Sequence, residues 1–168
     1  MKNYNSGSLP GIVSILTKIR IAVSQDYAPP VDDLIRAQIV PYIIQLLKPT
    51  LFKEEDLITE ALWIVANIAS RESDHVNYLM GNDIVQKVLP LLEHPNFHVQ
   101  ENVIWILSNI CGESLVYRDQ VLKYGIADKI DKFLGKFEGP ESIIVCMAWF
   151  ISNLCRGEPY PAFNDVRP

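Results

Sequence analysis

The residues in this sequence best suited to binding chemistry are three tryptophans, each followed four positions later by an asparagine. The pairs are Trp63–Asn67, Trp105–Asn109 and Trp149–Asn153. Residues four positions apart lie on the same face of an α-helix, so each pair shares a helix face. If the three copies lie on equivalent helices, the pairs form a ladder along one surface of the protein.

The chemistry of such a ladder suits an extended basic peptide. An asparagine side chain both accepts and donates hydrogen bonds, so it can pair with the backbone of another chain. Neighbouring indole rings can hold the aliphatic stems of lysine and arginine, with about 0.5–2 kcal/mol of cation–π attraction each. Acidic residues near the tryptophans would select positive side chains, and the candidates are Glu60, Glu101 and Glu113.

The alternative is that the three tryptophans are core residues at helical spacing. A buried asparagine in every copy would then need its own hydrogen-bond partners. The recurrence of the whole pair, in register, therefore favours an exposed ladder over a core stripe.

The tryptophans are 42 and 44 residues apart, a period typical of helical solenoids of the armadillo and HEAT type. Each unit contains a short, a medium and a long apolar-periodic segment, and nothing has the alternation of a strand. We expect helices at 10–24, 31–37, 39–48, 54–70, 74–80, 84–93, 98–111, 116–124, 126–137 and 141–155. Gly81 and Gly125 are expected to take left-handed positions between short and medium helices.

The fold expected is therefore an all-α, right-handed superhelix of about three full three-helix repeats plus one leading helix. Residues 1–9 are predicted to be a disordered lead, 10–158 the repeat domain, and 159–168 a tail resembling the start of a further repeat. The helix 141–155 and the segment 159–163 carry more apolar surface than their own unit can cover. We expect another protein, or a second copy of this chain, at that C-terminal edge.

Length, composition and charge narrow the function. A chain of 168 residues can bury one core, and no apolar run approaches the length of about 20 residues that spans a membrane. The first ten residues do not resemble a secretory leader. A net charge of −5 argues against nucleic acid as a partner and favours basic ones.

No metal, cofactor or catalytic site is predicted. Cys111, Cys146 and Cys155 lack zinc-site spacing and are expected to be buried thiols in a reducing compartment. His94 and His98 flank a turn without a third ligand and are expected to be loop residues. Glycine-rich phosphate loops and metalloprotease or hydrolase motifs are absent, so an enzyme is disfavoured.

Five segments of the sequence resemble a known family. The chain is similar to importin alpha, the armadillo-repeat adaptor that carries nuclear localisation signals, from about residue 10 to 162. The matching segments are Pro29–Ala37, Ala61–Ser70, Val103–Gly112, Tyr117–Gly125 and Trp149–Arg156. The resemblance implies that the three pairs belong to the second, third and fourth repeats, the family's major site for basic peptides. It also implies a protein of the cytoplasm and nucleus.

The resemblance also implies roles for the residues that stand at matching positions in this sequence. The resemblance implies lysine slots lined by Trp63, Trp105 and Trp149, and peptide-backbone contacts from Asn67, Asn109 and Asn153. Asn102 is assigned to the same peptide-binding surface. Glu113 stands where the family usually has an aspartate that pairs with the key lysine.

Several departures bear on function. Arg71 stands where the family typically has glycine beside the lysine pocket, and Val76 replaces a small hydroxyl residue. Arg71 lies eight residues after Trp63, so it either pairs with Glu113 and blocks the pocket or turns away. The family's basic N-terminal segment is missing, which argues against binding to importin beta. The family's repeats after the fourth are missing too.

Two functions remain. The first is an importin-alpha-like adaptor, or a fragment of one, that binds basic nuclear-localisation-type peptides for import into the nucleus. The second is an armadillo scaffold derived from importin alpha, retired from transport and held in a larger assembly. Both functions imply the same fold, and they differ in whether the groove lined by the tryptophans still binds a peptide.

Overall fold

A computed structural model describes residues 9–167 of the chain, and every regular element in that range is helical. The elements are α1 (Leu9–Val23), α2 (Val31–Arg36), α3 (Val40–Leu46), η1 (Pro49–Leu51), α4 (Glu55–Ala69), α5 (Ser73–Met80), α6 (Ile84–Val88), η2 (Leu89–Glu93), α7 (Phe97–Glu113), α8 (Leu115–Leu122), α9 (Ile126–Leu134), α10 (Glu141–Cys155) and α11 (Phe163–Val166). The predicted all-α solenoid is confirmed.

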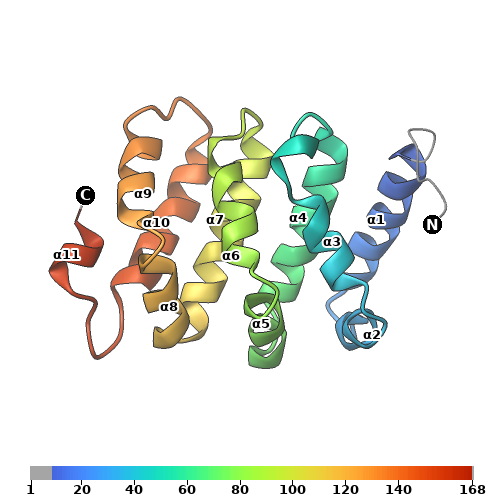
Figure 1. Ribbon diagram of the computed structural model, residues 1–168, viewed down its shortest axis with the longest axis horizontal. Helices are drawn as coiled ribbons and strands as arrows, with labels where there is room; N and C mark the ends of the chain where they lie inside the picture. Colours follow the sequence, from blue (N-terminus) through green and yellow to red (C-terminus); the bar gives the residue numbers. More distant parts are fainter. Residues whose placement is uncertain (1–8, 168) are drawn as a thin grey trace.

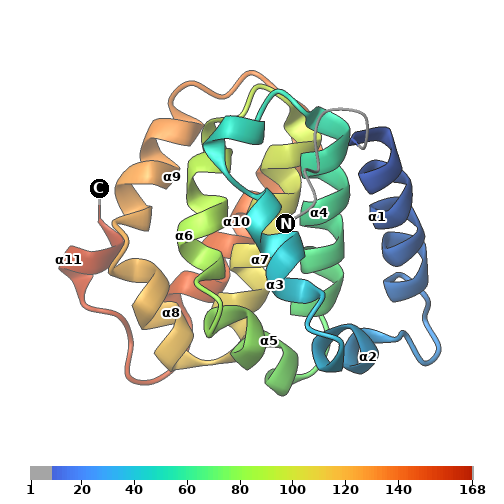
Figure 2. The ribbon, with the colours of Figure 1, turned by 45° about the vertical axis from the view of Figure 1, so that its right-hand side comes forward.

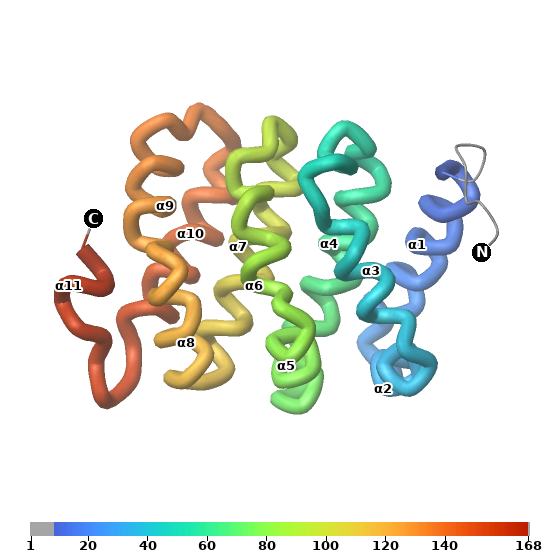
Figure 3. Tube along the Cα trace, viewed as in Figure 1, coloured from blue at the N-terminus to red at the C-terminus, as the bar shows by residue number. Residues whose placement is uncertain are grey.

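The helices stack in layers. The long helices α4, α7 and α10 lie side by side, and α1 continues their row at the N-terminal end (Figure 1). The medium helices α3, α6 and α9 lie in front of them in a second row, which the turned view also shows (Figure 2). The short helices α2, α5 and α8 follow one edge, so the chain traces the same path three times (Figure 3).

Burial explains why the long helices hold the stack together. On α7 the side chains of Val103, Ile106 and Ile110 are completely buried, and they recur at three- and four-residue spacing. Full burial of such an aliphatic side chain contributes about 1.5–3 kcal/mol. On its two sides α7 packs against the long helices α4 and α10, so the register of one unit fixes that of the next.

Most helix bounds agree with the prediction to within a few residues. The predicted helix 84–93 is divided into α6 and η2, because Pro90 lacks the N–H that an α-helix would use there. The C-terminal tail forms the short helix α11. The predicted disordered lead falls almost entirely outside the described residues, and Leu9 is already the first residue of α1.

The turn between short and medium helix corrects one prediction. Gly125 is left-handed as expected, with φ of 66°, but Gly81 is right-handed, with φ of −64°. The left-handed residue of that unit is Asp83, at φ 57°, and Gln38 takes the same place in the unit before, at φ 55°. The helix runs on through Gly81, whose N–H bonds to the Asn77 carbonyl at 3.0 Å, so the turn closes two residues later.

Candidate functional site

The three tryptophans project from the stack. Trp63, Trp105 and Trp149 are 46%, 42% and 57% exposed, whereas flanking residues such as Ile64 and Ile106 are completely buried. The interpretation of the tryptophans as core residues is therefore wrong, because each of the three long helices presents an exposed indole.

A hollow of about 410 Å³ lies between Trp63 and Trp105. Its walls come from three successive long helices, α4, α7 and α10, and its lining residues are Thr59, Trp63, His98, Glu101, Asn102, Trp105 and Cys146. The sequence had pointed to Glu101 and Asn102, but not to the roles of Thr59, His98 and Cys146. Each of these lies three, four or seven residues before a tryptophan, so helical spacing counted back from each indole could have found them.

Trp63 already holds a cation from its own chain. The guanidinium carbon of Arg20, on α1, lies 4.6 Å from the centroid of the Trp63 ring. The Arg20 Nε donates to Glu60 Oε2 at 2.6 Å, and both side chains are mostly buried. Sequence reasoning placed Glu60 at the rim for a peptide and missed Arg20, which is 40 residues away along the chain. An indole and a carboxylate on α4 thus bind a positive side chain in the way proposed for the ladder.

The three ladder asparagines have different surroundings. The Asn67 amide donates to the carbonyl of Trp63 at 2.9 Å, within its own helix. The Nδ2 of Asn109 is buried and has no hydrogen-bond partner among the described residues. Asn153 is only 4% exposed, and its amide donates to both the carbonyl and the hydroxyl of Ser108 at 3.0 Å.

Asn153 therefore joins α10 to α7. Small residues on α7 make room for it, because a side chain at Gly112 would begin 3.2 Å from the Asn153 Nδ2. The recurrence of the pair in the sequence does not give three equivalent side chains. Asn102 has a partner within its helix, donating to the His98 carbonyl at 2.8 Å.

Arg71 and Glu113 do not meet. The Arg71 guanidinium donates to the carbonyls of Val23 at 3.2 Å and Gln25 at 2.9 Å, where α1 ends. A cation is favourable at a helix C-terminus because the last carbonyls are unpaired there. Glu113 instead accepts a hydrogen bond from the Ser73 hydroxyl. Arg71 has thus turned away from Glu113, and Val76 is a core residue at 1% exposure.

The three cysteines differ in how exposed their thiols are. Burial raises the pKa of the Cys111 thiol to about 12, and Cys111 fits the predicted buried thiol. Cys155 is exposed, so that prediction is wrong for it. Burial, and then the negative charge of Glu101, raise the pKa of Cys146.

His98 lies in the first turn of α7 and is not the loop residue expected. His94 does lie in the loop between η2 and α7, as expected, but it is buried. It is 2% exposed, and its Nε2 lies 2.9 Å from the Phe52 carbonyl while its Nδ1 accepts the Asn96 N–H at 3.0 Å. Across the described residues, no group of three histidine, cysteine or acidic side chains is placed to hold a metal ion. In the same part of the chain, no helix is both long and apolar enough to cross a membrane.

The comparisons with known proteins agree with this architecture. The model of the armadillo/beta-catenin-like repeat family matches residues 28–70 and 73–112. Importin subunit alpha-8 of Arabidopsis thaliana is 36% identical over 91% of this chain and 32% of its own length. Importin subunit alpha-1b of Oryza sativa subsp. japonica is 32% identical over 90% of this chain and 28% of its own length. The chain thus spans about a third of these relatives.

Solved structures show the same fold. A designed armadillo repeat protein in complex with the peptide (KR)4 has a TM-score of 0.76 and 24% identity, over 89% of this chain and 60% of that protein. Computationally designed armadillo repeat proteins for modular peptide recognition give a TM-score of 0.77 at 19% identity, with the same coverage. Residues 28–70 and 73–112 of this chain thus match armadillo repeats, and most of the chain is similar to about a third of the importin alpha subunits.

Proposed function

We propose that this chain is an adaptor module, without catalytic activity, that binds extended lysine- or arginine-rich segments of cargo proteins. The observation that carries the proposal is the hollow between two exposed indoles, with Glu101 in its wall. Homology to importin alpha subunits supports a role in nuclear import, with the protein in the cytoplasm and the nucleus.

The hollow fits the stem of one basic side chain. A lysine or arginine entering between Trp63 and Trp105 would pack its methylenes against the rings and bring its charge towards Glu101. The contact of Arg20 with Trp63 and Glu60 is an intramolecular example of this chemistry. It also means that the α1 side of Trp63 is occupied, and that the α7 side is the one left for a peptide.

Asn109 is the backbone contact best prepared for a ligand. Its unpaired amide donor costs about 1–3 kcal/mol while it stays buried without a partner. Rotation of the side chain towards the groove would let Nδ2 donate to a peptide carbonyl and remove that penalty. Asn67 and Asn153 would first have to give up bonds within the protein, to Trp63 and Ser108.

Glu113 extends the proposed site beyond Trp105. Arg71 is held at the end of α1, so within residues 9–167 the Ser73 hydroxyl is the only side-chain hydrogen-bond partner of the Glu113 carboxylate. A lysine could therefore reach Glu113 without displacing Arg71. Replacement of Arg71 should consequently act on the stability of α1 more than on peptide affinity.

The test is fluorescence anisotropy with labelled (KR)4 as the probe. We expect binding that weakens as salt is raised. Trp105→Ala should lower the affinity by about tenfold or more, since it removes a wall of the hollow worth roughly 1.5 kcal/mol or more. Tyr27→Ala is the matched control, because Tyr27 is a 91% exposed aromatic residue that does not line the hollow. Absence of binding, or equal loss in both variants, would refute the proposal.

The second candidate is a scaffold held in a larger assembly, and the C-terminal edge favours it. An apolar hollow of about 210 Å³ lies between α8, α9, α10 and α11, and includes Ile126, Ile130, Leu134 and Ile151. Val145 on α10 and Phe163 on α11 are 63% and 72% exposed. A protein or a second copy seated there would continue the stack. Sedimentation at increasing concentration tests the second copy, and a strictly monomeric chain would exclude it.

A further inference from the structure

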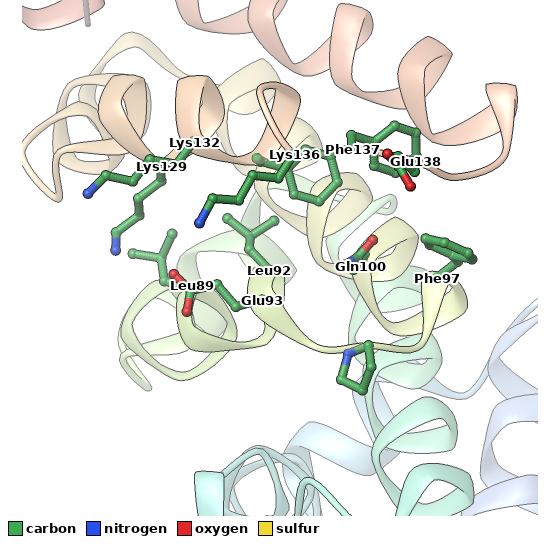
Figure 4. A pocket seen from close by; sticks show the side chains of 12 residues that line it. Leu89, Leu92, Glu93, Phe97, Gln100, Lys129, Lys132, Lys136, Phe137 and Glu138 are labelled. Carbon is green, nitrogen blue, oxygen red and sulfur yellow. The ribbon is translucent and has the colours of Figure 1, made fainter.

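A pocket of about 520 Å³ opens between two successive units. Residues of η2 form one wall and residues of α9 the other (Figure 4). The first turn of α7 and the segment after α9 close one end. The pocket is lined by Leu89, Leu92, Glu93, Pro95, Phe97, Gln100, Lys129, Lys132, Phe133, Lys136, Phe137 and Glu138.

The apolar part of the pocket is aromatic. Phe133 and Phe137 are stacked with centroids 5.1 Å apart, and Phe97 meets Phe137 edge-on at 6.0 Å. Leu89 and Leu92 form the opposite wall. Aromatic side chains favour a further ring in offset or edge contact, with about 0.5–1.5 kcal/mol per pair beyond the burial of area. An aromatic or large apolar group is the natural occupant of this part.

Gln100 brings a buried polar atom to the pocket. It donates through Nε2 to the His94 carbonyl at 2.7 Å, which fixes the orientation of the amide. Its Oε1 is then buried, and no donor within residues 9–167 reaches it. A buried acceptor in this state costs about 1–3 kcal/mol, and a ligand N–H at this end of the pocket would satisfy it.

Positive charge runs along one wall. Lys129 and Lys132 lie three residues apart on α9, and Lys136 follows in the turn after that helix; all three are exposed. Figure 4 shows their ammonium groups at separate positions, so the charge is spread along a row rather than gathered at one point. Within residues 9–167 none of the three takes part in an ion pair. The two acidic residues of the lining, Glu93 and Glu138, leave an excess of one positive charge on a chain whose net charge is −5.

We propose that this pocket binds an acidic peptide segment that carries one aromatic side chain. In an extended peptide alternate residues lie about 6.6–6.8 Å apart on one side, so two acidic side chains can pair with different lysines of the row. The aromatic side chain packs on Phe133 and Phe137, and a backbone N–H donates to Gln100 Oε1. A ligand with a single carboxylate would engage one lysine and leave the rest of the row unused.

This pocket is separate from the hollow between Trp63 and Trp105. Its two walls are η2 and α9, it shares no lining residue with that hollow, and the ligand proposed for it has the opposite charge. The chain can therefore hold a basic segment and an acidic segment at the same time. Failure of either site in a binding assay leaves the other untouched.

The test uses the whole chain and a short fluorescein-labelled peptide of glutamates around one tryptophan. Lys132→Glu combined with Lys136→Glu should weaken binding by about tenfold or more, because two attractive pairs become repulsive. The control is Lys123→Glu, which alters an exposed lysine outside the pocket and should change the affinity by less than about twofold.

The peptide supplies a second test. Replacing its tryptophan by alanine, or its glutamates by glutamines, should each reduce binding by about tenfold if both the aromatic pocket and the lysine row are used. Equal affinity of the glutamine peptide would overturn the proposal, and so would a loss on Trp105→Ala as large as that on the lysine double variant. Competition by indole-3-propionate at the same affinity as the peptide would show a small-molecule site and overturn it too.

Discussion

Arg20 controls how much of the tryptophan ladder is open, and Arg20→Met tests this. Methionine keeps most of the aliphatic stem but removes the charge that lies over Trp63 and pairs with Glu60. In the parent chain, one indole face and one carboxylate are thus used internally. The variant should release both to an incoming basic peptide.

The size of the effect follows from the contacts. A cation over an indole at 4.6 Å contributes about 0.5–2 kcal/mol, and a partly buried ion pair at 2.6 Å adds about 1 kcal/mol more. Arg20→Met should therefore lower the free energy of unfolding by about 1–3 kcal/mol, partly because Glu60 is left without its partner. The affinity for (KR)4 should rise by about five- to thirtyfold, the equivalent of 1–2 kcal/mol.

Two measurements are needed. Urea unfolding followed by circular dichroism gives the stability, and anisotropy with labelled (KR)4 gives the affinity. The gain in affinity should disappear when Glu60→Gln is added, because the released carboxylate is then gone. A folded Arg20→Met chain whose affinity is unchanged or lower would refute the view that Arg20 competes with a peptide.

Two further predictions concern the turns and the thiols. Gln38→Gly should stabilise the chain by about 1 kcal/mol, because a non-glycine residue at φ 55° pays a backbone penalty that glycine avoids, while Gly125→Ala should destabilise it by a similar amount. Urea unfolding measures both, and since a Cβ at Gly125 would meet no atom within 4 Å, a larger loss there would contradict a purely backbone origin. At pH 8, iodoacetamide should alkylate Cys146 more slowly than the exposed Cys155, because the raised pKa of Cys146 lowers its thiolate fraction. The alkylation rate of Cys146 should also reach its plateau at a higher pH than that of an ordinary thiol. Glu101→Gln should raise the rate at which Cys146 is alkylated, and bound (KR)4 should lower it. Mass spectrometry of the labelled sites measures both rates. If bound (KR)4 did not protect Cys146, the peptide would have to bind elsewhere.

Part of this protein could be predicted from local pattern alone. The recurrence of tryptophan and asparagine four residues apart, at intervals of 42 and 44, predicted the repeat, the long helices and an indole on the outside of each. These features depend on helical periodicity and on the partition of apolar residues to one face, which are properties of neighbouring residues. Gly125 was predictable for the same reason, since its left-handed backbone is a local preference of glycine.

What only the tertiary structure decided are the contacts between one unit and the next. Arg20 covers Trp63, Arg71 binds the end of α1 instead of Glu113, and Asn153 is buried against Ser108, each across about 40 residues of chain. The lysines on and just after α9 likewise face a pocket only because η2 of the preceding unit is stacked beside them. Such contacts depend on the offset and spacing of adjacent helices, which the packing of the whole core sets, so identical residues in successive repeats come to have different partners.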